Sequence, residues 1–137
     1  MKREFMMSFI LVFLLFLNIN CASTPEISRA SGNSWLSSQT APPEAKVDGT
    51  WYSDDWGKIT LTQTQGTQNV SGRVDPDGGI IDGVVTDKKV YLIFSYNAKI
   101  YYSAILTVAS DNLLTGVWAR ELITERSKTE PMKLIKK

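Results

Sequence analysis

The segment Val47-Asp48-Gly49-Thr50-Trp51 decides how this chain is organised, because its spacing recurs three times downstream. The other copies are Val70-Ser71-Gly72-Arg73-Val74, Ile81-Asp82-Gly83-Val84-Val85 and Leu114-Thr115-Gly116-Val117-Trp118. Each copy places a glycine between two apolar residues on one face of a β-strand, since side chains alternate with a period of two. Glycine inside a strand is kept where a sheet bends or another group approaches the backbone closely. Four such positions predict a sheet that curls into a small antiparallel barrel.

Strand-length runs separated by turn residues continue to the end of the chain, and no helical run of ten residues appears after the N-terminal segment. Short strands joined by tight turns favour an all-β fold, an eight-stranded antiparallel up-and-down β-barrel over residues 47–137. The predicted strands are 49–52, 58–64, 69–74, 80–86, 89–96, 100–109, 113–121 and 132–135.

The alternation within these strands also predicts which side chains fill the barrel. The large aromatic members of this inward set are Trp51, Phe94, Tyr102 and Trp118, with Trp51 near one rim. Truncating Trp118 to alanine is expected to cost about 3 to 5 kcal/mol, as for other large core residues. The remaining predicted inward residues are Ile59, Leu61, Val70, Val74, Ile81, Val85, Val90, Leu92, Ala104, Leu106, Val108, Leu114, Met132 and Leu134.

The first 20 residues have the parts of a secretory signal peptide. Lys2 and Arg3 supply positive charge, and residues 5–17 are almost unbroken apolar sequence, which is too short to span a bilayer and suits a signal core. Cys21 follows where bacterial lipoproteins carry the residue that receives acyl chains. Asn18 and Asn20 depart from the usual lipobox, so cleavage without lipidation, giving a soluble secreted protein, is the alternative.

Lipidation of Cys21 would anchor the protein stably, because two or more acyl chains are needed for firm membrane attachment. The absence of an aspartate after the cysteine favours the outer membrane of the cell envelope. Residues 21–46 are rich in Ser, Thr, Pro and Asn and predict a disordered, flexible tether. Within it, the apolar pair Trp35 and Leu36 either docks on the barrel, is captured by a partner or is incidental.

Composition excludes several functions. The 15 basic and 14 acidic residues nearly cancel, so the charge balance gives no reason to expect nucleic acid, whose binding needs a basic face. The chain has no histidine and a single cysteine, which excludes an intrachain disulfide and a Cys/His zinc site and removes the commonest general base. Most candidate carboxylates fall in turns, where aspartate is favoured for backbone hydrogen bonding alone. We therefore expect no catalysis, no metal and no cofactor.

The outward face of two central strands is unusually apolar. Tyr91 and Ile93, with Tyr101 and Ile105 on the neighbouring strand, are predicted to form a contiguous patch of the kind that marks a partner surface. Cover by the tether or a crossed register is the alternative interpretation.

The run Gly49-Thr50-Trp51-Tyr52-Ser53 and the glycine-spaced strands after it resemble the calycin-like barrels, lipocalins and avidins, and a group of small bacterial exported proteins that share them. The resemblance covers residues 47–121 and implies that Trp51 packs across the closed end. In lipocalins an arginine of the last strand lies over this tryptophan, and Lys133 or Arg120 is the candidate here. Biotin binding does not carry over, because Ser53 replaces the asparagine with which avidins read biotin.

Two functions fit these features. The first is a membrane-anchored envelope lipoprotein whose barrel is a non-catalytic binding module for a macromolecular partner, an envelope or host protein, in the manner of an adhesin or inhibitor. The alternative is a carrier that holds a small apolar ligand in the barrel interior. The large inward residues favour the first, because they compete with a cavity.

Overall fold

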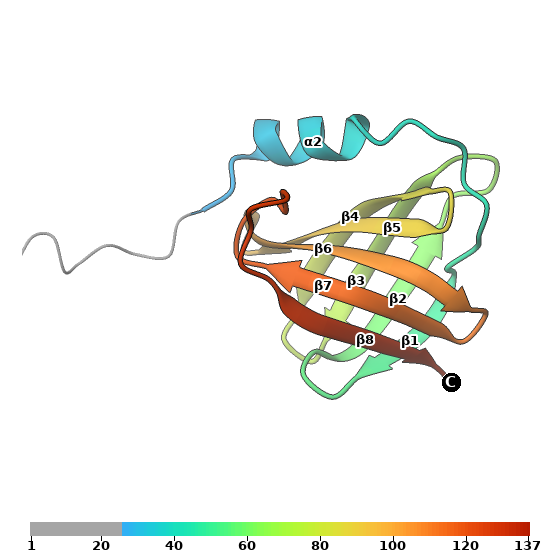
Figure 1. The fold of residues 1–137 in the computed structure, drawn as a ribbon. Coiled ribbons are helices and arrows are strands. Elements are labelled where there is room, and N and C mark those ends of the chain that lie inside the picture. Colours follow the sequence, from blue (N-terminus) through green and yellow to red (C-terminus); the bar gives the residue numbers. More distant parts are fainter. Residues whose placement is uncertain (1–25) are drawn as a thin grey trace, which may run out of the picture.

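Residues 26–137 of the protein are described by a computed structural model, shown as a ribbon in Figure 1. The predicted signal peptide and the predicted lipidation site at Cys21 lie outside the described residues. The described chain begins with a short helix on the outside of a barrel and then forms the barrel itself. Among these residues, no helix has the length and apolar character needed to cross a bilayer.

The barrel is closed and has eight strands, each antiparallel to its neighbours in chain order. The ring closes where Trp51 and Tyr52 of the first strand pair with Lys136 and Ile135 of the last. The fold class is thus as the glycine spacing predicts, and each predicted strand agrees with the structure to within two residues. The strands are β1 (Gly49–Ser53), β2 (Gly57–Gln63), β3 (Asn69–Asp75), β4 (Gly79–Thr86), β5 (Lys89–Tyr96), β6 (Lys99–Ser110), β7 (Leu113–Ala119) and β8 (Glu130–Lys136).

The repeated glycines allow close approach of neighbouring strands. A β-carbon on Gly72 would collide with the main-chain oxygen of Thr60, and one on Gly116 with that of Ile105. Both glycines lie within strands on the inward face, opposite Leu61 and Leu106. The glycine spacing therefore reflects backbone approach across the barrel wall, as the sequence predicts.

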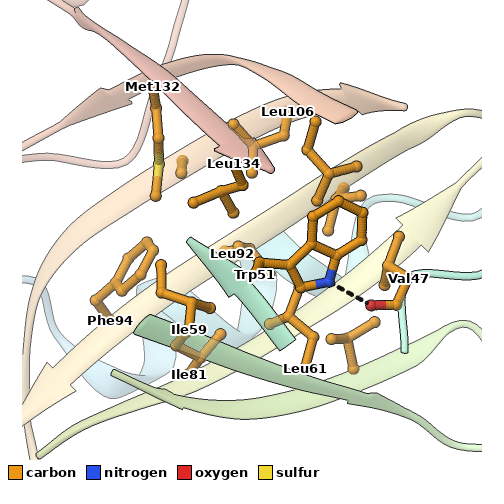
Figure 2. Close-up of a cluster of buried hydrophobic side chains, with 14 of the residues drawn as sticks. Val47, Trp51, Ile59, Leu61, Ile81, Leu92, Phe94, Leu106, Met132 and Leu134 are labelled. Carbon is orange, nitrogen blue, oxygen red and sulfur yellow. Dashed lines mark hydrogen bonds between the residues drawn. The ribbon is translucent and has the colours of Figure 1, made fainter. Parts of the chain in front are cut away.

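The interior is packed with apolar side chains from all eight strands (Figure 2). Every residue predicted to point inward belongs to this cluster or packs directly against it. Trp51 is buried, and its indole N–H donates a hydrogen bond to the main-chain oxygen of Val47 over 2.9 Å. Val47 is itself fully buried, although its position before the first strand left it out of the predicted set.

The cation over Trp51 differs from the one expected. Lys136 places its ammonium group 5.5 Å from the centre of the indole ring. Lys133 lies on the outward face of β8, since Met132 and Leu134 on either side of it are buried. Arg120 lies beyond the end of β7. Lys136 is directly opposite Trp51 in the β1–β8 pairing, which puts both side chains on one face.

The predicted flexible tether is wrong for the described residues before β1. They contain a nine-residue helix, α2 (Arg29–Ser37), capped by the Ser28 side chain, which accepts a hydrogen bond from the Ser31 N–H. Ile27 pairs with Ile100 before the helix, and Pro43 pairs with Asp87 after it. We call residues 27–46 the strap, because they run over the outside of the barrel from one end to the other (Figure 1).

The strap is held against the barrel by apolar contacts that could not be predicted from its mostly polar composition. Leu36 is buried, and Gly32, four residues earlier on the same helix face, packs against the side chains of Ile93 and Ile100. Trp35 meets Tyr91 edge to face, with 5.6 Å between ring centres. Arg29 forms an ion pair with Asp82 of β4 at 3.6 Å and donates a hydrogen bond to the hydroxyl of Ser95, an otherwise buried polar group. The nine-residue helix is therefore stabilised by packing its apolar side chains against the outer surface of the barrel.

Candidate functional site

The two ends of the barrel differ in chemistry. At one end the strap leads into β1, and Trp51, Val47 and Lys136 close the interior. At the other end lie the β1–β2, β3–β4, β5–β6 and β7–β8 connections. This second end carries a pocket of about 560 Å³, which we call the mouth. Its lining residues are Asp55, Trp56, Asp77, Tyr96, Tyr101, Tyr102 and Trp118.

Several aromatic rings of the mouth are set nearly perpendicular to their neighbours, whereas Tyr101 and Tyr102 meet at 54°. Trp56 meets Tyr102 at 87° and Trp118 at 85°, with 5.4 and 5.2 Å between ring centres. Tyr96 meets Tyr102 at 88° over 6.1 Å. These are the edge-to-face arrangements that aromatic pairs favour, so the rings hold each other in place. A ligand in the mouth would meet aromatic faces in more than one direction.

Trp56 forms the floor of the mouth. It belongs to the turn between β1 and β2, where its main-chain N–H donates to the Ser53 hydroxyl over 3.3 Å and the following Gly57 has a φ of +77°. Its ring lies 4.8 Å from that of Phe94, which is fully buried in the barrel core. Trp56 thus continues the core outward and separates it from the mouth, so this pocket lies at the end of the barrel and not in its middle.

Tyr96 and Asp77 form the polar side of the mouth. The Tyr96 hydroxyl donates a hydrogen bond to one carboxylate oxygen of Asp77 over 3.2 Å, and the other oxygen accepts from the Gly79 N–H over 3.2 Å. Gly79 has no side chain to obstruct the Tyr96 ring, which occupies the place of its β-carbon. Burial, together with the negative charge of Asp77, raises the pKa of Tyr96 well above the usual tyrosine range. Tyr96 therefore remains a hydrogen-bond donor at neutral pH.

A second pocket adjoins the mouth and shares Asp55 and Trp118 with it. It has a volume of about 690 Å³ and is bounded by the β7–β8 connection. The fully buried Ser103 hydroxyl fastens this connection to β6, since it donates to the main-chain oxygen of Glu121 over 2.5 Å and accepts from the Ile123 N–H over 3.1 Å. The other residues around this pocket are Ala119, Arg120, Glu121, Lys128, Glu130 and Pro131.

The predicted partner surface is not free. Tyr91 and Ile93 do point outward, but Ile93 is fully buried and Tyr91 packs against the cluster beneath α2. Ile105 is half-buried, and Tyr101 contributes to the lining of the mouth. The strap covers the centre of the patch, which is the alternative that the sequence leaves open, and the Trp35–Leu36 pair docks on the barrel.

The predicted core aromatics divide between the interior and the mouth. Trp51 and Phe94 are buried in the interior, whereas Tyr102 and Trp118 are half-buried and line the mouth. Sequence reasoning missed Trp56 and Tyr96 as site residues. Tyr96 could have been predicted to point inward, because it continues the alternation of Leu92 and Phe94. Trp56 could not, because it lies in a turn, where alternation does not predict which way a side chain points.

The chain matches no protein-family model, no curated protein and no solved structure. Within residues 26–137, no group of three or more histidine, cysteine, aspartate or glutamate side chains is arranged to hold a metal ion. The site is thus defined by its own geometry: an aromatic pocket with two carboxylates at the end of a closed antiparallel barrel.

Proposed function

We propose that this protein is a non-catalytic binding module that takes its ligand in the mouth, and that it works as a lipid-anchored protein of the bacterial cell envelope. The observation that carries the proposal is the mouth itself, a pocket of about 560 Å³ walled by five aromatic side chains on a rigid barrel. Ligand sites in proteins are concave, mostly apolar and oriented by a few polar groups, and this pocket fits that description. We also propose that the protein is related to the calycin-like barrels.

The direction of the strap supports the anchoring part of the proposal. Ile27 pairs with Ile100, next to Tyr101 and Tyr102 of the mouth, so the described chain starts at the mouth end of the barrel. Cys21 lies six residues before Ile27, and an extended chain of that length reaches at most about 20 Å. Acyl chains on Cys21 would therefore hold the mouth within about 20 Å of the bilayer. We favour the outer membrane as that bilayer.

A small ligand is favoured over a macromolecular partner by one specific observation. The outer patch of Tyr91 and Ile93, which suited an adhesin-like or inhibitor-like role, is covered by α2, whereas the mouth is open. An envelope or host protein stays a candidate only through a side chain or chain end that enters the mouth. The ligand site proposed here is the aromatic end of the barrel, whereas the sequence alternative of an apolar ligand uses the barrel interior.

The test of ligand binding is fluorescence titration with N-phenyl-1-naphthylamine, an uncharged aromatic probe that brightens in apolar sites. The protein is expected to bind it saturably, and Trp118→Ala to weaken binding by about tenfold, as loss of one anchoring aromatic does. Trp35→Ala is the matched control, because this half-buried tryptophan belongs to the strap and does not line the mouth, so its loss should leave binding unchanged. Tyr101→Ala gives a second mouth variant should Trp118→Ala fail to fold. No saturable binding, or equal loss with Trp35→Ala, would overturn the proposal.

The anchor is tested separately by intact-mass measurement of the mature protein and by detergent partition. A lipidated protein carries the mass of its acyl chains on Cys21 and enters the detergent phase, and Cys21→Ser returns it to the aqueous phase. An unmodified wild-type mass with aqueous partition would support secretion as a soluble protein instead.

A further inference from the structure

The carboxylates of the mouth have no cationic partner. Within residues 26–137 the one ion pair closer than 4.0 Å joins Arg29 of the strap to Asp82 on the outer wall of the barrel. Asp55 and Asp77 line the mouth, and no lysine or arginine lines it with them. The mouth thus presents two negative charges among aromatic rings.

The adjoining pocket does not cancel this charge. It adds Glu121 and Glu130 to the acidic side and Arg120 and Lys128 to the basic side, so the two pockets together have four acidic and two basic side chains and a net charge of −2. Asp77 is fixed in place by two hydrogen bonds, from Tyr96 and from the Gly79 N–H, neither of which brings a positive charge. Two uncompensated charges at the rim of an aromatic pocket attract a cation and repel an anion.

The aromatic lining of the mouth favours one kind of cation. The negative face of an aromatic ring attracts a cation within about 6 Å of its centre, and tryptophan is the strongest partner. Trp56 and Trp118 stand at 85° to each other, and Tyr96 and Tyr102 at 88°, so the rings that line the pocket do not all share one orientation. Alkylated ammonium groups suit such a cage, because they carry charge on an apolar surface that gives up its water easily.

We infer that the mouth binds a small organic ammonium ion, with the aromatic faces of Trp56 and Trp118 around its alkyl groups and the Asp55 and Asp77 carboxylates balancing its charge. This inference rests on the proposed function and names the ligand class of the same site. A quaternary ammonium fits best, since it offers no N–H that would need a hydrogen-bond acceptor inside the cage. The cation is identified by this chemistry whether it is a free metabolite or the end group of a larger molecule.

The experiment is isothermal titration of the full mature chain with choline and with 3,3-dimethyl-1-butanol, which has the same shape but no charge. Choline is expected to bind at least tenfold more tightly than the alcohol. Asp55→Asn and Asp77→Asn should each weaken choline binding by about fivefold, the effect of one partly solvated charge, and leave the alcohol unaffected. An asparagine oxygen still accepts one of the two hydrogen bonds that Asp77 receives, and its amide NH2 group can donate to the Tyr96 hydroxyl, so the fold should persist.

Asp111→Asn is the matched control, because Asp111 lies in the β6–β7 turn at the other end of the barrel. It should leave both affinities unchanged. Equal affinity for choline and the alcohol, or no effect of Asp55→Asn and Asp77→Asn, would overturn the inference. Binding of the naphthylamine probe in the same samples distinguishes the outcomes. If the probe binds and choline does not, the ammonium inference fails and the proposed function stands; if neither binds, both fail.

Discussion

Replacing Trp51 by phenylalanine tests whether the closed end of the barrel is built as described. The indole N–H makes a 2.9 Å hydrogen bond to the main-chain oxygen of Val47, and both residues are buried. Phenylalanine leaves that oxygen without a partner, at a cost of about 1–3 kcal/mol. The smaller ring also leaves a void, which adds about 1 kcal/mol. We expect Trp51→Phe to lower the free energy of unfolding by about 2–4 kcal/mol.

This loss is a large share of the about 5–15 kcal/mol that stabilises a domain of this size, so the variant should fold with reduced stability. The assay is urea unfolding followed by far-ultraviolet circular dichroism, which does not depend on the tryptophan that is removed. Trp35→Phe is the control for the same chemical change. Its indole bond to Ile123 is long, at 3.4 Å, and only partly buried, so it should cost less than about 1 kcal/mol. Equal costs for the two variants would refute the reasoning.

Three further predictions follow from single positions. Ala98 has a φ of +66° beside Asn97 in the two-residue β5–β6 turn, so Ala98→Gly should stabilise the protein by about 1 kcal/mol in the same urea assay, and a loss of stability would contradict the turn geometry. Gly116→Ala should destabilise the protein by about 3 kcal/mol, because the added β-carbon would collide with the Ile105 main chain. Gly66→Ala should cost only about 1 kcal/mol, because Gly66 has free space around it and only its φ of +76° disfavours alanine. Similar costs for the two variants would show that the strands do not approach closely at Gly116. Tyr96→Phe should remove the most alkaline step of phenolate absorbance, because burial and Asp77 raise the pKa of Tyr96. The stability that protonated Tyr96 contributes is fully present below about pH 10 and is lost as the pH rises through the pKa of Tyr96 in the folded protein. An absorbance titration that Tyr96→Phe leaves unchanged would contradict this prediction.

The barrel could be predicted from the sequence because its two faces differ. One face of each strand is buried and the other meets solvent or the strap, so the period of two identifies the inward residues, and a shift by one residue would expose them all. The same rule placed Tyr102 and Trp118 inward. It could not show that they end the core and begin a pocket, since alternation carries no information on where the interior meets solvent.

The strap could not be predicted from composition, because its stability lies in contacts far away in sequence. Serine, asparagine and proline dominate residues 26–46, and the helix is too short to be stable alone. Its contact residues, Gly32, Trp35 and Leu36, bury themselves against side chains about 60 residues further along the chain. The same contacts explain why Tyr91 and Ile93 resemble a free patch in the sequence but form an internal interface in the fold.

The truncation of Trp118 is also reinterpreted. A fully buried tryptophan would cost about 3 to 5 kcal/mol, but this side chain is half-buried at the mouth. The structure therefore assigns more of its role to the pocket than to stability, and its loss should affect ligand binding before it affects folding.

Ligand binding in the mouth is measured most directly through the four tryptophans, since each gives one indole N–H signal in a proton–nitrogen correlation spectrum. Benzyltrimethylammonium, which combines an aromatic ring with a quaternary ammonium, is titrated into the labelled protein. Binding in the mouth should give saturable shifts of the Trp56 and Trp118 signals and leave those of Trp35 and Trp51 unchanged. Unmoved Trp56 and Trp118 signals at high ligand concentration, or larger shifts at Trp35 or Trp51, would contradict it.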